Sequence, residues 1–228
     1  MTDTIVVTGA SRGLGAHCAT RLHEAGYKVI GLGRKPTKDL PYVTRIVDVA
    51  DAASVKAGVD DLRRDESVYA LINAAGIASM NLVLTTPAET VKKIIDTNLL
   101  GTIYCCQAVA PALIKRGNGR IINFSTVGVP LAIKGEAVYV ASKAGVEGFT
   151  RVFAREMAPH GVTVNSVAPG PIATGLLEKV AQEKIDNVVA QQLIARQGEP
   201  EDVWNIVSLL LRPESSMITG QTIYVGGA

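Results

Sequence analysis

Aromatic residues are scarce in this chain of 228 residues, where Phe, Trp and Tyr together make up 4%. A hydrophobic core therefore has to be built from Val, Ile, Leu and Ala. Hydrophobic residues make up 47% and charged residues 19%, a composition that supports a sizeable core and excludes an intrinsically disordered chain. A chain of this length forms one large domain or two small ones.

An excess of charge of either sign is also missing. The sequence has 23 basic and 21 acidic residues, a formal net charge of +2, and no run of five like charges. Proteins that bind nucleic acid or anionic membrane surfaces usually concentrate basic residues. We therefore expect neither nucleic acid nor a membrane among the partners of this protein.

Cysteine and histidine are too few and too scattered for a structural framework. The three cysteines are too few for a disulfide framework, and their spacing matches no zinc-binding pattern. The three histidines form no ligand cluster. We expect no bound metal and no structural disulfide. The residues concerned are Cys18, Cys105, Cys106, His17, His23 and His160.

The chain also lacks a long hydrophobic run of the membrane-spanning kind. Its longest uncharged stretch, residues 97–114, contains Asn98, Gln107 and Pro111, so we interpret it as a buried helix. The first residues lead directly into an apolar run, with no basic segment and no signal-type cleavage site. We expect a soluble protein located in the cytoplasm.

Short runs rich in β-branched residues alternate along the chain with segments of helical periodicity. The long segment 86–116 is expected to be helical, with breaks near Asn98 and Pro111. The expected strands are 4–8, 28–32, 43–47, 68–72, 120–124, 162–167 and 223–225, and the expected helices are 14–25, 51–65, 86–116, 137–158, 176–195 and 200–211.

Such alternation predicts βαβ units, which require a parallel sheet with helices on both faces. The fold class we expect is α/β, with a single Rossmann-like doubly wound parallel sheet formed by one domain over residues 1–228. Ligands of such sheets bind beyond the carboxyl ends of the strands, near the point where the strand order reverses. The residues that follow each strand are therefore the candidates for function.

The first strand is followed by T-G-A-S-R-G-L-G, residues 8–15. Glycines at 9, 13 and 15 permit a tight turn and a close approach of the backbone to a pyrophosphate at the start of a helix. The spacing differs from the common GxGxxG, so an ordinary glycine-rich turn between strand and helix remains an alternative.

The same loop also matches G-x-S-x-G, the nucleophile elbow of serine hydrolases, with Ser11 as the nucleophile. Too few residues precede it for the strand that carries part of the oxyanion hole. His160 and Asp186 would also have to complete the triad in an atypical order. This interpretation is the remote alternative.

The second strand ends at Gly33, Arg34 and Lys35, where NAD-binding proteins usually place a carboxylate for the ribose 2′-hydroxyl. Guanidinium groups suit a 2′-phosphate instead. We therefore predict NADPH in preference to NADH, with Arg34 and Arg12 as the contacts. Solvated loop charges are the alternative.

Polar and small residues follow the next two strands. Asp48 is placed to accept a hydrogen bond from an adenine amino group, or to act as a helix N-cap. The segment Asn73–Gly76 has the small residues that let a backbone pass beside a flat ligand. A turn stabilised by the Asn side chain is the alternative there.

Tyr139 and Lys143 lie one helical turn apart, after the hydroxyl pair Ser125 and Thr126 at the end of the fifth strand. The pair alone is a weak signal, and its value comes from its position. A neighbouring ammonium lowers the pKa of a phenol, which can then act as a general acid towards a carbonyl oxygen. A nearby hydroxyl can hold that oxygen.

At this point the sequence resembles the short-chain dehydrogenase/reductase family over its whole length. The resemblance rests on the loop 8–15, Asp48, the segment 73–76, Asn98, the Ser–Thr pair, Tyr139, Lys143 and Pro169-Gly170, all in the family's order. It implies that Tyr139 is the catalytic acid/base, that Lys143 lowers its pKa and binds the nicotinamide ribose, and that Asn98 holds a water in a proton relay. It also implies that the segment 169–174 closes over the nicotinamide.

The resemblance extends to the cofactor contacts. The residues expected to contact the dinucleotide are Gly9, Ser11, Arg12, Gly13, Leu14, Gly15, Arg34, Asp48, Val49, Asn73, Ala74, Ala75, Gly76, Tyr139, Lys143, Pro169, Gly170, Ile172 and Thr174.

One position departs from the family pattern. The family usually has a Ser 13 residues before the Tyr, and here that position is Thr126, with Ser125 one residue earlier. Alternation at a strand end points the two side chains in opposite directions. We expect Thr126 to hold the carbonyl oxygen, with Ser125 as the alternative.

Within the family the sequence looks most similar to 3-oxoacyl-(acyl-carrier-protein) reductases. This implies NADPH-dependent reduction of a carbonyl to a secondary alcohol and a homotetramer or homodimer. Oxidation of an alcohol, sterol or sugar with NAD is the second hypothesis, and a dinucleotide sensor without turnover is the third. The resemblance places substrate specificity in the segment 174–199, whose apolar residues suit either an apolar substrate or helix packing, and we prefer packing. The helix of Tyr139 carries a stripe of apolar residues, for which we also prefer packing in the core over contact with another subunit. These residues are Leu176, Leu177, Val180, Val188, Val189 and Leu193, and Val146, Phe149, Phe153 and Met157.

Overall fold

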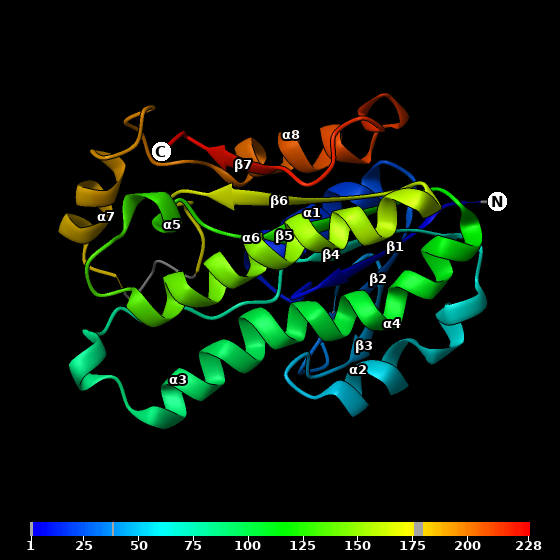
Figure 1. Ribbon diagram of the computed structural model, residues 1–228, viewed down its shortest axis with the longest axis horizontal. Coiled ribbons are helices and arrows are strands. Elements are labelled where there is room, and N and C mark those ends of the chain that lie inside the picture. Colours follow the sequence, from blue (N-terminus) through cyan, green and yellow to red (C-terminus); the bar gives the residue numbers. More distant parts are fainter. Residues whose placement is uncertain (1, 38, 176–179) are drawn as a thin grey trace.

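A computed structural model describes residues 2–37, 39–175 and 180–228 of the protein, and all seven of its strands lie in one parallel sheet (Figure 1). The strand order is β3-β2-β1-β4-β5-β6-β7. The sheet thus confirms the predicted fold class. The strands are β1 (Thr4–Thr8), β2 (Lys28–Gly33), β3 (Val43–Ile46), β4 (Val68–Asn73), β5 (Gly119–Phe124), β6 (Val162–Pro169) and β7 (Thr222–Val225).

The helices connect the strands and cover both faces of the sheet. They are α1 (Gly13–Glu24), α2 (Ala52–Val59), α3 (Ala88–Ile95), α4 (Gly101–Arg116), α5 (Gly128–Leu131), α6 (Ala137–Met157), α7 (Gln182–Val189) and α8 (Pro200–Leu211). Figure 1 shows α4 and α6 running across one face and α1 behind the sheet. Successive strand residues point to opposite faces of the sheet. Val6 packs against the core beneath α2, α4 and α6, whereas Ile5 and Val7 pack beneath α1 and α8. The core is aliphatic, as predicted.

The strand order reverses between β1 and β4, which places the predicted ligand edge beside them. Thr8 is in register with Asn73, Asn73 with Asn123, and Asn123 with Ser166. The segments that follow these residues therefore lie along one edge of the sheet. The arrow of β6 points to the end of the molecule where α5 and α7 lie (Figure 1).

The helical region 88–116 departs from the α-helix once. A π-helical turn at Asp96–Leu100 carries Asn98, where a break was predicted, but α4 runs through Pro111 without ending. The second predicted break is wrong because Ala110, Ala112 and Leu113 are buried around the proline and hold the helix in place. The region 88–116 is long and apolar enough to cross a membrane, but half of its most apolar window is buried inside the molecule. That burial is typical of a core helix.

The segment before α8 is less helical than predicted. The expected helix 176–195 begins outside the described residues, since 176–179 are not described, and α7 covers only Gln182–Val189. Beyond α7 the backbone bonds to other strands and loops instead: the Ile194 N–H donates to the Gly226 carbonyl at 2.8 Å, and Gly198 pairs with Ile172. In this segment Val188 is buried and Leu193 is exposed, and the predicted contacts of Leu176 and Leu177 lie outside the described residues.

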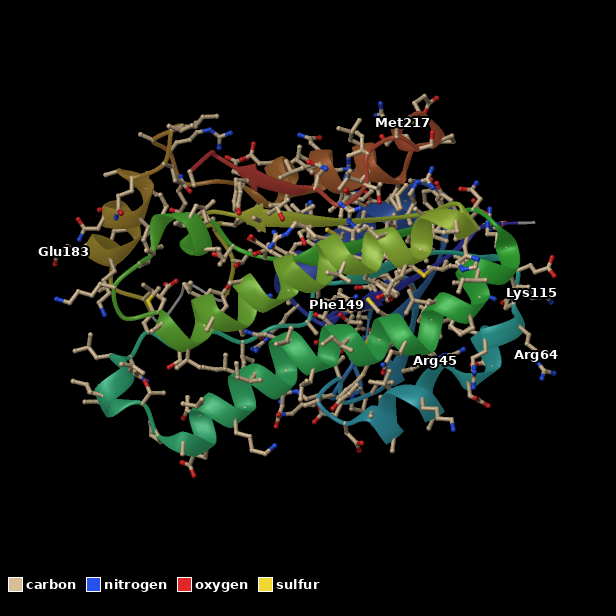
Figure 2. All side chains as sticks on the ribbon, viewed as in Figure 1. Arg45, Arg64, Lys115, Phe149, Glu183 and Met217 are labelled. Carbon is tan, nitrogen blue, oxygen red and sulfur yellow. The ribbon has the colours of Figure 1, made fainter. Side chains whose placement is uncertain are left out.

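The apolar stripe on α6 belongs to the core only in part. Val146 and Met157 are buried, whereas Phe149 and Phe153 are partly exposed and stack with ring centroids 5.0 Å apart. Figure 2 shows Phe149 between α6 and α4. The prediction of core packing is right for the two ends of the stripe, and the predicted oligomer stays a prediction.

Candidate active site

The glycine loop (residues 8–15) and the turn after β4 (residues 73–76) are in close backbone contact at the point where the strand order reverses. Gly9 has φ +68°, and a Cβ added there would lie 2.8 Å from Ala75 Cα. The Ala75 N–H donates to Thr8 Oγ1 at 3.0 Å. Only a glycine permits this approach, so the loop and the segment 73–76 form one continuous rim.

The first turn of α1 opens from this rim towards solvent. Arg12 precedes the helix in an extended conformation, and its side chain does not cap the helix. Gly13 has φ +58°, with no atom within 4 Å of an added Cβ, and Ser11, Arg12 and Gly13 are exposed. Uncapped N–H groups beside open space, at the positive end of a helix, fit a phosphate group.

The structure does not support the alternative of a serine hydrolase. Ser11 follows β1 and its hydroxyl lies 3.6 Å from where a Cβ on Gly33 would be. His160 ends the 3-10 turn that leads into β6, at the opposite edge of the parallel sheet, and Asp186 lies in α7. The three residues are not assembled into a triad.

Arg34 and Asp48, which follow β2 and β3, lie side by side. Both line a pocket of about 220 Å³ whose other wall comes from the α3 region and includes Glu89, Lys92 and Lys93. Arg12 is not among the residues that line it. The N-cap alternative for Asp48 is wrong, because Asp51 caps α2 by accepting from the Ala53 N–H at 2.9 Å, whereas Asp48 accepts from the Ala50 N–H within its own turn.

Lys143 and Asn98 meet beside the turn after β4. The Lys143 ammonium is buried and donates to the Phe124 carbonyl at 2.7 Å. A Cβ on Gly76 would lie 3.4 Å from Asn98 Oδ1 and 3.5 Å from Lys143 Nζ. The Asn98 amide accepts from the Ile77 N–H at 2.8 Å and donates to the Ile77 carbonyl, so the π-helical turn positions it against this loop. A second proton of the amide goes to Ser142 Oγ at 3.0 Å.

The two hydroxyls at the end of β5 point in different directions. Ser125 Oγ donates to the buried Glu147 carboxylate at 2.6 Å. Thr126 Oγ1 accepts from the Gly128 N–H at 3.1 Å, and its hydroxyl lies near enough to Tyr139 to act on the pKa of the phenol. The Ser125 hydroxyl is thus engaged by Glu147, and Thr126 is the one of the two hydroxyls that acts on Tyr139.

The electrostatics of the tyrosine differ from the sequence-based expectation. Burial, together with the negative charge of Glu136, raises the pKa of Tyr139 to about 12, and the hydrogen bond with Thr126 acts in the opposite direction. Burial lowers the pKa of Lys143 to about 8. The expected lowering of the Tyr139 pKa by Lys143 is not found, and the ammonium is directed at the Phe124 carbonyl.

The segment after β6 contacts a residue that sequence reasoning missed. A Cβ on Gly170 would lie 1.7 Å from Gln192 Oε1, so the amide of Gln192 occupies the space that a larger residue would need. Ile172 is buried, and the Thr174 hydroxyl turns back to the Ile172 carbonyl at 3.4 Å. Gly170 and Ile172 line a second pocket, of about 250 Å³, between α8 and β7.

Two buried carboxylates on or next to α6 were also missed. Glu136 and Glu147 stand three residues before and eight residues after Tyr139. The helical spacing of Tyr139, Lys143 and Glu147 was a usable signal for the second. No signal marked the first, because its position depends on how the α5 turn packs against α6.

Taken together, the strand order, the glycine loop at its reversal and the uncapped α1 define a Rossmann-type protein that binds a dinucleotide. A family model described as Enoyl-(Acyl carrier protein) reductase matches residues 9–227. The 3-oxoacyl-(acyl-carrier-protein) reductase FabG of Staphylococcus aureus is 38% identical over all of this chain and 98% of its own. The short-chain reductase protein NovJ of Streptomyces niveus is 36% identical over 97% of this chain and 92% of its own.

Among solved structures, the ligand-free aldohexose dehydrogenase of Thermoplasma acidophilum superimposes with a TM-score of 0.90, at 31% identity over 99% of this chain and 93% of that chain. The chain belongs to the short-chain dehydrogenase/reductase family, and it is an NAD(P)-dependent oxidoreductase.

Proposed function

We propose that the protein reduces a carbonyl group to a secondary alcohol with NADPH, in the manner of a 3-oxoacyl-(acyl-carrier-protein) reductase. The observation that carries the proposal is that Thr126 and Tyr139 lie together with the buried ammonium of Lys143 at the carboxyl edge of the sheet. A phenol and a second hydroxyl at this place suit an oxygen that gains negative charge during the reaction.

The glycine loop fits the dinucleotide. The uncapped N–H groups of α1 and the open space at Gly13 suit the pyrophosphate, and the segments 73–76 and 169–174 flank the path from there to Tyr139. The cofactor contacts given by the family resemblance thus lie on connected parts of one edge. When bound, the reduced nicotinamide supplies a hydride to the carbonyl carbon, whose oxygen takes up a proton from the protein.

The chain's own residues hold and protonate that oxygen. The Thr126 hydroxyl donates a hydrogen bond to it, and the Tyr139 hydroxyl delivers the proton. The Tyr139 phenol is protonated at neutral pH, as a proton donor has to be, and its raised pKa makes it a weaker acid than a free tyrosine until a positive charge approaches. The Lys143 ammonium stabilises the phenolate that remains and then passes it a proton, and the neutral amine takes up a proton from solvent through the groups around Asn98.

The choice of NADPH rests on the end of β2. The residue that would carry an NAD-type carboxylate is Gly33, and Arg34 lines the neighbouring pocket together with Lys92 and Lys93. Of these cations, Lys92 pairs with Asp96, whereas Arg34 forms no ion pair with any residue that the structure describes. An unpaired guanidinium at this place favours a 2′-phosphate.

Two substrate classes are supported by the relatives. The curated relatives named as 3-oxoacyl-(acyl-carrier-protein) reductases support an acyl thioester. The structural relative named as an aldohexose dehydrogenase supports a second candidate, a hydroxylated carbonyl compound of the sugar type. The buried carboxyl of Glu136 beside the two hydroxyls favours this second class. Cytoplasmic location and a homotetramer or homodimer remain predictions from the family resemblance.

The replacement Tyr139→Phe tests the proposed role of the phenol. We expect NADPH oxidation with a panel of carbonyl compounds to fall about 100-fold or more, because the proton donor is lost. Fluorescence titration should give an NADPH affinity within about twofold of the wild type. A variant that retains full turnover would refute the assignment of Tyr139, and a wild-type protein that binds NADPH but reduces no carbonyl would refute the function.

A further inference from the structure

Glu136 is a buried acidic residue next to the catalytic hydroxyls, and the proposed reaction does not use it. The residue is 7% exposed. It stands at the N-cap position of α6, but its carboxyl makes no capping hydrogen bond to the free N–H groups of that helix. The side chain is therefore not explained by helix capping, the usual role of an acidic residue at this position.

The carboxyl group points instead towards the α5 turn. A Cβ on Gly128 would lie 3.1 Å from Glu136 Oε2 and 3.4 Å from Thr126 Oγ1, so the carboxylate and the hydroxyl converge on the same point. The charge of Glu136 also acts on Tyr139, whose pKa it raises. Glu136, Thr126 and Tyr139 thus surround one small region.

No residue that the structure describes neutralises this carboxyl. Across residues 2–37, 39–175 and 180–228, no hydrogen bond or ion pair to its side chain is found, and burial alone raises its pKa. Neither oxygen of this carboxyl is among the fully buried atoms without a partner in the described residues, so a donor from solvent can reach them, and such a donor stabilises the charged form that burial disfavours. An unpaired acceptor beside the reacting oxygen is therefore a place for a donor that the substrate brings.

We propose that Glu136 determines substrate specificity by accepting a hydrogen bond from a hydroxyl group adjacent to the reacting carbonyl, so that hydroxylated carbonyl compounds of the sugar or polyol type are preferred. This inference rests on the proposed carbonyl reduction and narrows its substrate. A simple oxoacyl thioester carries no hydroxyl there and directs only oxygen lone pairs or apolar groups at the carboxylate. Such a ligand leaves Glu136 unpaired and more deeply buried.

The test uses two ketones that differ by one hydroxyl: acetoin (3-hydroxy-2-butanone) and 2-butanone, with an acetoacetyl thioester as a third substrate. Glu136→Gln keeps the shape and removes the charge, and Glu136→Met removes the acceptor. We expect the ratio of kcat/KM for acetoin to kcat/KM for 2-butanone to fall about 10-fold in the first variant and about 100-fold in the second, since the effect of the Glu136 charge on Tyr139 is common to both ketones. Glu156→Gln, an exposed position on the same helix, is the matched control.

The outcomes separate this inference from the function on which it rests. The inference is overturned if the wild type has similar kcat/KM values for the thioester, 2-butanone and acetoin and the variants change all three values by the same factor. That outcome leaves the proposed carbonyl reduction intact. A wild type that binds NADPH but reduces none of the three overturns both. NADPH titration and thermal unfolding report whether each variant is folded, and if Glu136→Met does not fold, the wild-type preference and Glu136→Gln decide the question.

Discussion

Ser125 Oγ donates a hydrogen bond of 2.6 Å to Glu147 Oε1, and both residues are buried. The second carboxylate oxygen accepts from the Tyr224 hydroxyl at 3.0 Å. The hydrogen bond to the Glu147 carboxylate fixes the orientation of Ser125. Because side chains alternate at the end of the strand, the following side chain, that of Thr126, faces Tyr139. We therefore propose that Ser125 is a positioning residue and that Thr126 is the hydroxyl of the site.

Alanine replacements of the two residues should therefore have different effects. We expect Thr126→Ala to lower kcat for carbonyl reduction about 100-fold while the free energy of unfolding changes little, because a hydroxyl that holds the developing oxyanion is lost. Ser125→Ala should lower the free energy of unfolding by about 1–3 kcal/mol, since Glu147 keeps a single partner. Steady-state kinetics and urea unfolding measure the two quantities. A larger loss of kcat in Ser125→Ala would reverse the assignment.

The activity should also depend on the charge of Lys143. Burial lowers its pKa to about 8, so the ammonium is present below that pH and is lost above it. Because the charged form supports the proton transfer, kcat/KM for reduction should fall as the pH rises through about 8. The pKa of the Cys105 thiol is raised to about 12 and that of Tyr139 to about 12, so neither titrates in this window.

The pH profile of kcat/KM from pH 6 to 10 checks this expectation, since it reports groups of the free enzyme. Lys143→Arg keeps the charge over the whole range and should give a flat alkaline limb at reduced activity. A wild-type profile that stays level up to pH 10 would contradict the assignment.

The strands and the order of the motifs could be predicted from the sequence because both depend on local pattern. Apolar runs and their turn residues mark β1, β4 and β5, and the spacing of Tyr139 and Lys143 follows from helical periodicity. The partners of side chains in space could not be predicted. Gln192 meets Gly170 only because the chain after α7 is tied to the loop after β7, and Glu136 meets Thr126 only because α5 forms a turn between them.

Cofactor preference should change with the charge of Arg34. We expect Arg34→Asp to weaken NADPH binding about 10-fold or more and to improve NADH binding, because a carboxylate repels the 2′-phosphate and accepts from the 2′-hydroxyl. Arg64→Asp makes the same change of charge on the exposed turn near Lys115, at the end of the molecule opposite Glu183 of α7 (Figure 2), and should leave both affinities unchanged. Fluorescence titrations of the wild type and both variants give the dissociation constants for NADPH and NADH, and a ratio in Arg34→Asp that equals the wild-type ratio would reject its assignment.

Gly13 and Gly26 offer a matched pair for the phosphate site. Both have positive φ, +58° and +89°, and neither has an atom within 4 Å of an added Cβ. Alanine at either position strains the backbone by about 1–2 kcal/mol, so both variants should unfold more easily. Gly26 lies at the far end of α1, whereas Gly13 lies at the open N-terminus where the pyrophosphate is proposed to bind.

Gly13→Ala should therefore also weaken NADPH binding, by about 10-fold or more, because its methyl group fills the space that the phosphate needs and alters the first N–H groups of the helix. Gly26→Ala should keep the wild-type affinity at the same loss of stability. Thermal unfolding and NADPH titration of both variants separate strain from contact. Equal affinities in the two variants would place the phosphate elsewhere, since the backbone strain is common to both and only the position relative to the site differs.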